Sequence, residues 1–199
     1  MTLQDRLARV KLLALDFDGV MTDNHVYTFA DGSEAVRTSR ADGIGIERLK
    51  ALGIRVVVIT SEPPFTAGHR SICDVRCAKL GLQVAHVNNG FTKLDILKSY
   101  MSIYPQLEMA EVAYVGNDVN DLECLQAIGV PFIPRDATEQ LQRALGCYFQ
   151  ERALMPTVPN GKMTEANGGD GAVREVADLI ADAIEQHKPN LQRVAEALG

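Results

Sequence analysis

The stretch LLALDFDGVMTDNHVY, residues 12–27, carries the pattern that decides both the fold and the site. An apolar run ends at Asp16, a second carboxylate follows at Asp18, and Gly19 comes next. Side chains two residues apart on a strand point to the same face. Two carboxylates held so close repel each other unless a cation, a shared proton or a bend of the chain relieves them. The stretch therefore predicts a buried strand at residues 11–16 that ends in a pair of acidic groups.

The length and composition favour one globular domain that spans residues 1–199. The chain is 46% hydrophobic and 23% charged, and a chain of this length buries a core without disulfide bonds. A net charge of −6 disfavours nucleic acid as a partner. We see no apolar run long enough for a membrane span and no apolar core of a secretory signal. We therefore expect a cytoplasmic protein without a membrane partner.

The cysteines and histidines show no ligand pattern in the sequence. We expect reduced thiols, although Cys73 and Cys77 could share one face of a helix, which leaves a metal pair as the less favoured alternative. We expect each histidine to be a surface or structural residue. The histidines are His25, His69, His86 and His187.

Beyond residue 16, strand patterns alternate with helix patterns. The turn signal ADGS predicts a hairpin between about 26 and 38, and a helix should follow with Asp42 as its N-cap and Gly53 at its end. Further strands are expected in IRVVVITS, QVAHV, EVAYVG and VPFIP, and further helices at 66–80, 92–104, in NDLECLQAIG and at 172–186. This alternation predicts an α/β fold, a parallel sheet with helices on both faces. Residues 154–171, rich in Gly, Pro and Asn, are expected to form a long loop.

Polar residues follow the predicted strands, at the edge of the sheet where ligands bind in such folds. They are carboxylates, amides and small hydroxyls, and one lysine begins the helix between two of the groups. In chain order they are Asp16, Asp18, Thr60, Ser61, Glu62, Lys93, Asn117, Asp118, Asn120 and Asp121.

This set of groups suits transfer of a phosphoryl group. A phosphate dianion repels a carboxylate unless positive charge is present, and Mg²⁺ prefers oxygen ligands. Asp16 can then attack phosphorus and form an aspartyl-phosphate, while Lys93 neutralises the transferring group. Asp18 can protonate the leaving alcohol and later take a proton from water. Thr60 and Ser61 can bind the phosphoryl oxygens.

Each piece also has a plain structural interpretation. A DxD sequence can be a turn, Thr-Ser at a strand end is often an N-cap, and a lysine at a helix start is usually solvated. The segment GNDVNDL could be a glycine turn with a cap. The order of all four pieces, each at a strand end, favours the functional interpretation.

The same pieces resemble the four motifs of the haloacid dehalogenase superfamily. They are LDFDGVMTD, VVVITS, Lys93 and YVGNDVND, in that order. The hairpin and the segments DGIGI, RCAKLG and GGDGAVREV resemble its small branch without a separate cap domain. That branch holds the 3-deoxy-D-manno-octulosonate 8-phosphate and N-acylneuraminate 9-phosphate phosphatases. The chain also resembles the phosphatase-like C-terminal module of acylneuraminate cytidylyltransferases.

The resemblance implies a Rossmann-like three-layer fold with a hairpin flap, Mg²⁺ dependence and a homotetramer in which the hairpins form a small barrel. It implies the catalytic residues Asp16, Asp18 and Lys93, and the metal ligands Asp16, Asp18, Asp118 and Asp121. It implies the phosphate- and substrate-binding residues Gly19, Thr60, Ser61, Glu62, Arg70, Asn117, Asn120 and Arg174.

Two departures from the family pattern bear on metal binding and substrate choice. Asn117 stands where the octulosonate enzymes carry the first of two consecutive aspartates, so we expect Asp118 to contact the metal directly. Glu62 stands where those enzymes have Gly-Arg, and a Glu there looks more like the nonulosonate phosphatases. The segments around 62–71 and 154–171 are also longer than the family pattern.

Three hypotheses follow from the sequence. The favoured one is a Mg²⁺-dependent phosphatase that acts on a small acidic sugar phosphate, a nonulosonate 9-phosphate or an octulosonate 8-phosphate. The second is a non-catalytic or weakly active oligomerisation or binding module related to the cytidylyltransferase domain. The third is a phosphatase for an unrelated metabolite. The presence of all the motif carboxylates together with Lys93 argues against a decayed site.

Overall fold

The computed structural model describes residues 1–64, 71–88, 90–147 and 158–197, and its centre is a parallel sheet. Within this part of the chain six strands pair in the order β5-β4-β1-β6-β7-β8, every neighbouring pair parallel. The strands are β1 (Leu12–Leu15), β4 (Arg55–Thr60), β5 (Gln83–His86), β6 (Val112–Val115), β7 (Val130–Ile133) and β8 (Lys162–Met163). Because β1 lies between β4 and β6, the residues that follow it emerge at the middle of the carboxyl edge.

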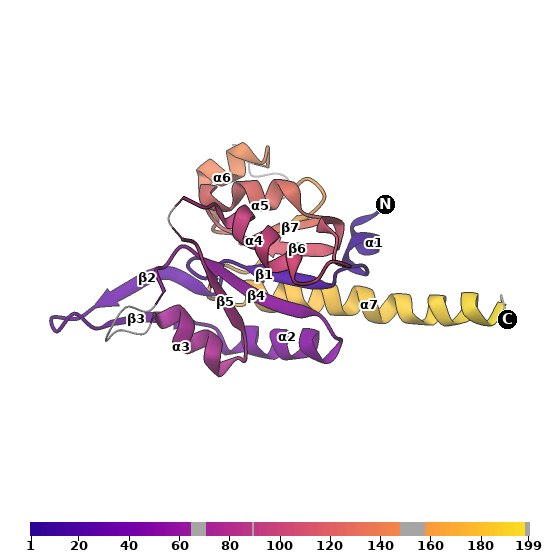
Figure 1. Cartoon of the computed structure of the whole chain (residues 1–199), viewed down its shortest axis with the longest axis horizontal. Helices are drawn as coiled ribbons and strands as arrows, with labels where there is room; N and C mark the ends of the chain where they lie inside the picture. Colours follow the sequence, from indigo (N-terminus) through magenta and orange to yellow (C-terminus); the bar gives the residue numbers. More distant parts are fainter. Residues whose placement is uncertain (65–70, 89, 148–157, 198–199) are drawn as a thin grey trace.

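Helices cover both faces of this sheet, which confirms the predicted three-layer α/β fold (Figure 1). One face is covered by α1 (Leu3–Leu7), α2 (Arg40–Ala51), α3 (Ile72–Lys79) and α7 (Ala172–Ala197). The other face is covered by α4 (Lys93–Ser102), α5 (Leu122–Ala127) and α6 (Glu139–Ala144). Two short 3-10 helices, η1 (Met109–Glu111) and η2 (Val119–Asp121), flank β6.

The strands are buried on both faces because alternate side chains enter two different cores. Leu13 and Leu15 pack with α2 and α7, whereas Leu12 and Ala14 pack with α4 and α5. All four are fully buried, and burying a leucine side chain contributes about 1.5–3 kcal/mol. The continuous apolar run of β1 thus holds the following Asp16 rigidly at the end of the central strand.

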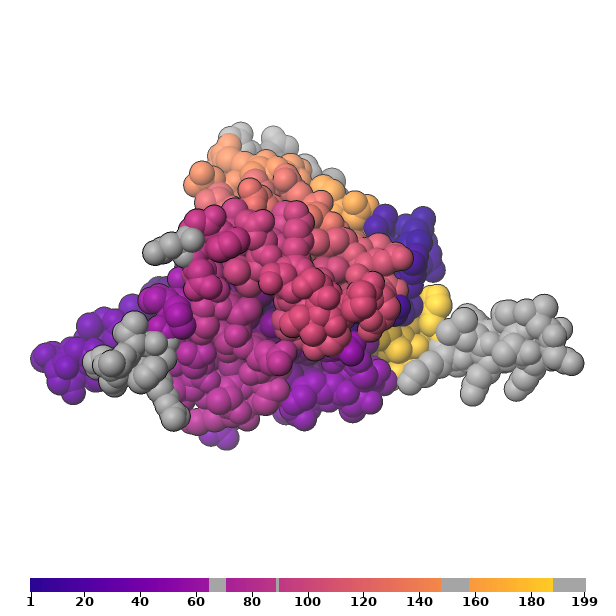
Figure 2. Space-filling model, viewed as in Figure 1, coloured from indigo at the N-terminus to yellow at the C-terminus, as the bar shows by residue number. Residues whose placement is uncertain are grey.

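The hairpin after β1 protrudes from the body of the molecule (Figures 1 and 2). It consists of β2 (Thr22–Thr28) and β3 (Glu34–Thr38), so it starts four residues before the predicted position at 26. The pairing is irregular between Thr22 and Val26, which hid this first part of the strand from the sequence pattern. Val26, Tyr27 and Phe29 are all more than half exposed. These three apolar side chains of the hairpin are therefore left largely uncovered in a single chain.

The prediction that Asp42 caps α2 is wrong. Ser39 is the N-cap, and its hydroxyl accepts a hydrogen bond from the N–H of Ala41. Asp42 is instead buried in the first turn of α2, where its Oδ1 accepts a hydrogen bond of 2.9 Å from the N–H of Arg174 at the start of α7. The carboxylate therefore caps a helix that lies far away in the sequence.

Other element bounds also differ from the sequence predictions. Helix α3 begins at Ile72 after the N-cap Ser71, and the first five residues of the predicted helix, 66–70, lie outside the described residues. The short strand β8 lies in the expected loop 154–171, and α6 was not predicted. Helix α7 continues past the predicted end at 186. The two-residue strand and the six-residue helix are too short to leave a clear periodic signal.

The thiols and the long helices give no further site. The four cysteines are buried free thiols, and Cys73 Sγ lies 3.9 Å from Cys77 Sγ, within hydrogen-bond distance for sulfur. In the described part of the chain no third Cys, His, Asp or Glu joins them as a metal ligand. None of the helices in that same part is long and apolar enough to cross a membrane.

Candidate active site

A small cavity of about 140 Å³ opens at the carboxyl edge of the sheet, where the polar residues were predicted to lie. It brings together residues that follow β1, β4 and β6 with the first residue of α4. The lining residues are Asp16, Asp18, Asn24, Thr60, Ser61, Glu62, Lys93, Asn117, Asp118 and Asn120. Asn24 is the only one among these that sequence reasoning did not select.

The charged centre of this cavity is Lys93, whose ammonium lies between two carboxylates. Lys93 Nζ is 2.8 Å from Asp16 Oδ1 and 2.8 Å from Asp121 Oδ1. All three residues are at most 5% exposed. Burial lowers the pKa of Lys93, but the two carboxylates raise it by more, so the net shift is upward. A lysine held this way stays charged beside Asp16.

Asp16 is the group whose ionisation depends most on this neighbourhood. Burial and the charge of Asp121 raise its pKa to about 7, whereas Lys93 opposes the rise. Asp16 Oδ1 also accepts a hydrogen bond of 2.8 Å from the N–H of Phe17. The lysine and this N–H therefore favour the ionised carboxylate, and the dry surroundings disfavour it.

Asp121 holds the loop after β6 and does not line the cavity. Its Oδ1 accepts hydrogen bonds from Lys93 and from the Tyr114 hydroxyl, at 2.8 and 2.7 Å. Its Oδ2 accepts the N–H groups of Asn117 and Asp118, at 3.0 and 3.2 Å. Both carboxylate oxygens are therefore occupied by protein donors. Sequence reasoning missed Tyr114, because inside an apolar strand it shows no mark of a polar role.

The turn after β1 is held by the hydroxyl of Thr22. This oxygen accepts the N–H of Gly19 at 3.1 Å and that of Asn24 at 3.2 Å, and the hydroxyl donates to Asp18 Oδ1 at 3.4 Å. Asp18 keeps contact with solvent. Partial burial, followed by the Glu62 carboxylate, raises the pKa of Asp18. The turn thus presents a second carboxylate that holds its proton more tightly than an ordinary aspartate.

Gly19 is required where the chain passes Asn117. Its φ of 77° is in the left-handed region, and a Cβ at this position would lie 1.9 Å from Asn117 Nδ2. The absence of a side chain lets the Asn117 amide approach Asp16 and Asp18. Gly19 therefore belongs to the site through its shape, although it does not line the cavity.

The Asn117 amide can be placed in two orientations. With its nitrogen toward the turn, it donates to Asp16 Oδ2 at 3.2 Å and to the carbonyl oxygen of Asp18 at 2.9 Å. With its oxygen there, three oxygens face one another with no proton between them. A proton on Asp16 would relieve this arrangement in part, whereas a cation could bridge all three oxygens, and oxygen donors of this kind suit Mg²⁺.

The four carboxylates predicted as metal ligands are not gathered into one cluster. Among the described residues no three Asp, Glu, His or Cys side chains lie together in a way that could hold an ion. Asp121 faces its four donors, and Asp118 Oδ1 accepts hydrogen bonds from Val119 N–H and from the Thr138 hydroxyl. The donor set that fits a magnesium ion is Asp16 Oδ2, the Asp18 carbonyl and the Asn117 amide oxygen.

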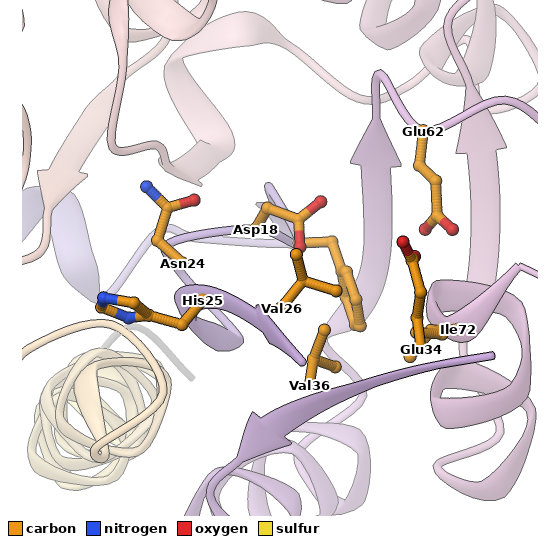
Figure 3. A pocket seen from close by; sticks show the side chains of 9 residues that line it. Asp18, Asn24, His25, Val26, Glu34, Val36, Glu62 and Ile72 are labelled. Atoms are coloured by element: carbon orange, nitrogen blue, oxygen red, sulfur yellow. The ribbon is translucent and has the colours of Figure 1, made fainter. Parts of the chain in front are cut away.

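A larger cavity of about 340 Å³ adjoins the first one and shares Asp18, Asn24 and Glu62 with it (Figure 3). The carboxylates of Glu62 and Glu34 point toward each other across it, the latter from the hairpin strand β3. The described residues that line it are Phe17, Asp18, Asn24, His25, Val26, Glu34, Val36, Glu62 and Ile72. The hairpin residues were not predicted, because the sequence pattern of an exposed hairpin does not indicate which of its side chains line a cavity.

Of four other predicted binding residues, two line the smaller cavity, one lines neither cavity, and one lies outside the described residues. Thr60 is buried, and its Oγ1 accepts the Glu62 N–H at 3.0 Å, whereas Ser61 is exposed. Arg174 lines neither cavity, and its Nε donates to Asp178 Oδ2 at 2.6 Å. Arg70 lies outside the described residues.

Comparison with known proteins gives relatives of two kinds. No protein-family profile matches the chain. The N-acylneuraminate cytidylyltransferase A of Danio rerio is 32% identical over 180 residues, which are 89% of this chain and 36% of that protein. The chain thus spans about a third of the length of this relative.

The second kind of relative is a phosphatase. The 3-deoxy-D-manno-octulosonate 8-phosphate phosphatase of Escherichia coli K12 is 30% identical over 173 residues, which are 86% of this chain and 79% of that protein. A phosphatase of the same name from Moraxella catarrhalis, solved with magnesium, phosphate and the sugar acid, superposes with a TM-score of 0.74 at 25% identity. The superposition covers 96% of this chain and 97% of that one.

These likenesses confirm the predicted superfamily, and the relatives of the second kind are named phosphatases. The likenesses extend over most of the chain, and the solved relative from Moraxella catarrhalis holds a magnesium ion. The chain belongs to the 3-deoxy-D-manno-octulosonate 8-phosphate phosphatase family of the haloacid dehalogenase superfamily.

Proposed function

We propose that the chain is a Mg²⁺-dependent phosphatase that hydrolyses the phosphate monoester of an acidic 2-keto-3-deoxy sugar. The observation that carries the proposal is the buried contact of 2.8 Å between Lys93 Nζ and Asp16 Oδ1 in the smaller cavity, beside Asp18. A nucleophile, a cation and a second carboxylate face one small space. That is the set of groups which phosphoryl transfer through an aspartyl-phosphate needs.

The proposed reaction has two steps. A carboxylate oxygen of Asp16 attacks phosphorus while the bond from phosphorus to the sugar oxygen breaks, and Asp18 gives its proton to the leaving alcohol. The raised pKa of Asp18 favours the protonated form that this step needs. Asp18 then takes a proton from the water that attacks phosphorus, which releases phosphate and restores Asp16. Lys93 neutralises negative charge on the transferring group in both steps.

The metal would be held by Asp16, the carbonyl oxygen of Asp18 and Asn117. We place Asn117 nearest to the ion, and not Asp118 as the sequence suggested, because the Asn117 amide faces the other two oxygens while Asp118 Oδ1 is occupied by Thr138 and Val119. When bound, the ion would supply positive charge against the phosphoryl oxygens. The removal of magnesium should therefore abolish turnover without unfolding the chain.

The larger cavity would receive the sugar. Its volume of about 340 Å³ suits a small molecule, and Glu62 lies where the two cavities meet. A glutamate at this position favours a nonulosonate 9-phosphate over an octulosonate 8-phosphate. None of the described residues that line this cavity is Lys or Arg. The sugar carboxylate would therefore have to meet a cation from elsewhere.

A homotetramer would supply such a group. The exposed Val26, Tyr27 and Phe29 of the hairpin would be covered by the hairpins of other copies, and Arg174 would act on a neighbour's site. Light scattering tests this proposal: the native chain should have the mass of four copies, and Tyr27→Asp with Phe29→Asp should lower it. A native chain with the mass of one copy would contradict the tetramer.

The alternative is a non-catalytic or weakly active module. It is favoured by the likeness to the Danio rerio cytidylyltransferase, of whose length the chain matches about a third. The complete set of Asp16, Asp18 and Lys93 argues for turnover, because a decayed site would lack one of them.

Phosphate release from a panel of substrates tests the proposal. The panel holds a nonulosonate 9-phosphate, octulosonate 8-phosphate, a hexose phosphate and phenyl phosphate, each with Mg²⁺ and with EDTA. We expect metal-dependent release that is highest for one of the acidic sugars and absent in Asp16→Asn. If the folded protein with Mg²⁺ releases phosphate from no substrate, the non-catalytic module becomes the better account.

A further inference from the structure

His86 lies outside the catalytic carboxylates but contacts the loop that carries Glu62. It is the last residue of β5, and its side chain is 13% exposed. Its Nδ1 lies 2.8 Å from the carbonyl oxygen of Glu62, and its Nε2 lies 3.0 Å from Asp74 Oδ1 in the first turn of α3. The ring therefore connects the loop after β4 to the helix beside it.

Both atoms that the ring faces are hydrogen-bond acceptors. A neutral imidazole has one N–H and donates one hydrogen bond, whereas the imidazolium donates two. The ring thus donates to Glu62 and Asp74 at once when both of its nitrogens are protonated. In that form it is also paired with the Asp74 carboxylate, which is one-third exposed.

Both the backbone N–H and the backbone carbonyl of Glu62 have partners. Its N–H donates to Thr60 Oγ1 at 3.0 Å, and its carbonyl oxygen faces His86 at 2.8 Å. His86 pairs with Thr60 in the sheet, and the N–H of Val87 donates to the Thr60 carbonyl at 2.9 Å. The direction in which the Glu62 side chain leaves the backbone is therefore fixed by β5.

We propose that His86 is a positioning residue that determines substrate specificity, because it holds Glu62 against the larger cavity. The pairing with Asp74 has a second effect, since Ile72 in the same turn of α3 lines that cavity (Figure 3). His86 thus fixes two walls of the sugar cavity relative to each other. The proposal rests on the phosphatase function argued above, and it concerns recognition of the sugar and not transfer of the phosphoryl group.

Kinetics of His86→Phe test this role with two substrates. The phenyl ring has nearly the shape of imidazole but donates no hydrogen bond. With the preferred sugar phosphate we expect kcat/KM to fall about tenfold, mainly through a higher KM, because uniform binding is lost. With phenyl phosphate, which carries the phosphoryl group but no sugar, kcat/KM should stay within about twofold. His86→Gln, which keeps an amide donor, should recover part of the loss.

A double-mutant comparison shows whether the effect passes through Glu62. In a Glu62→Gln background, the further change His86→Phe should add little to the loss on the sugar phosphate. The matched control is His187→Phe on α7, a histidine that lines neither cavity. This control should leave both substrates unchanged.

Hydrogen exchange gives a readout that needs no activity. The backbone amides of Ser61 and Glu62 should exchange about tenfold faster in His86→Phe than in the native chain and His187→Phe. Unchanged exchange, an equal loss on both substrates, or additive effects of the two mutations would each overturn the proposal. If the native chain hydrolyses nothing, the phosphatase function fails, and the exchange data still decide whether His86 positions the loop.

Discussion

The two adjoining cavities differ in how their charges are held. In the smaller one, Lys93, Asp16 and Asp121 are buried and paired with one another at 2.8 Å. In the larger one, Glu34 is exposed, and its carboxylate points toward that of Glu62 (Figure 3). Buried charges are costly unless they are paired, so the first arrangement tolerates little change. The second arrangement is open to water, so a substitution there should change the unfolding free energy and the turnover much less than one in the smaller cavity.

The largest effect is expected from Asp16→Asn. The amide cannot form the aspartyl-phosphate, so we expect phosphate release to fall by at least about 10³-fold with phenyl phosphate and with the sugar substrate. The circular dichroism spectrum should stay unchanged. The matched change in the larger cavity is Glu34→Gln, which should alter phenyl phosphate hydrolysis by less than about threefold. Comparable losses in the two variants would contradict the separation of chemistry from recognition.

The next largest effect is expected from Lys93→Met. The loss of the ammonium leaves Asp16 and Asp121 buried without their shared cation, which costs about 3–5 kcal/mol of unfolding free energy. Urea denaturation measures this loss. A second change, Asp121→Asn, removes one of the stranded charges and should restore part of the stability. If Lys93→Met costs less than about 1 kcal/mol, the pairing is not what holds this cavity.

A pair of glycine substitutions separates steric fit from backbone strain. Gly19 and Gly32 have nearly the same φ, 77° and 81°, but a Cβ at Gly19 would lie 1.9 Å from Asn117 whereas one at Gly32 meets nothing within 4 Å. Gly32→Ala in the hairpin should cost about 1 kcal/mol from strain alone. Gly19→Ala should cost about 2–3 kcal/mol and also lower turnover, because Asn117 must move. Urea denaturation measures the loss of unfolding free energy in both variants. Equal losses would show that the Asn117 side chain moves aside without loss of stability.

The sequence predicts the smaller cavity well because its residues follow apolar strands. Asp16, Thr60 and Asn117 each come next to a buried run, and parallel strands bring their carboxyl ends to one edge. The groups that hold them were not predicted. Tyr114 is hidden within a strand, and Thr138 meets Asp118 across 20 positions of the chain. Local patterns do not report such contacts.

The hairpin and the helix caps show the same limit. His25 and Glu34 line the larger cavity from the two strands of the protruding hairpin, and no periodicity in the sequence records such a contact. Asp42 was predicted to cap α2, but its carboxylate accepts the N–H of Arg174 in α7, and Ser39 caps α2 instead. The position of an element can thus be predicted from its own residues, whereas the role of a side chain at its end depends on what packs against it.

Asp42 is a buried carboxylate that lacks the cationic partner found in the smaller cavity, and its effect depends on pH. Its Oδ1 accepts the N–H of Arg174, but its Oδ2 has no hydrogen-bond partner among the described residues. Burial raises its pKa from 3.8 to about 6, although the Arg174 N–H and the charge of Arg76 oppose the rise. The folded protein therefore binds this proton more tightly than the unfolded chain does. The resulting stability is fully present below about pH 4 and is lost as the pH rises through about 6.

The variant Asp42→Asn tests the direction in which stability changes with pH. The amide oxygen can still accept the Arg174 N–H, and no charge remains to be buried. We expect the variant to match or exceed the native chain in unfolding free energy at pH 7, by at most about 3 kcal/mol. Its unfolding free energy should also change less with pH between pH 4 and 6.

Asp170→Asn is a control with the opposite pH dependence. The hydrogen bonds from Arg37 lower the pKa of Asp170, so the stability that Asp170 contributes is present above the unfolded pKa and is lost as the pH falls. If both variants change the pH dependence in the same direction, burial of Asp42 is not the cause.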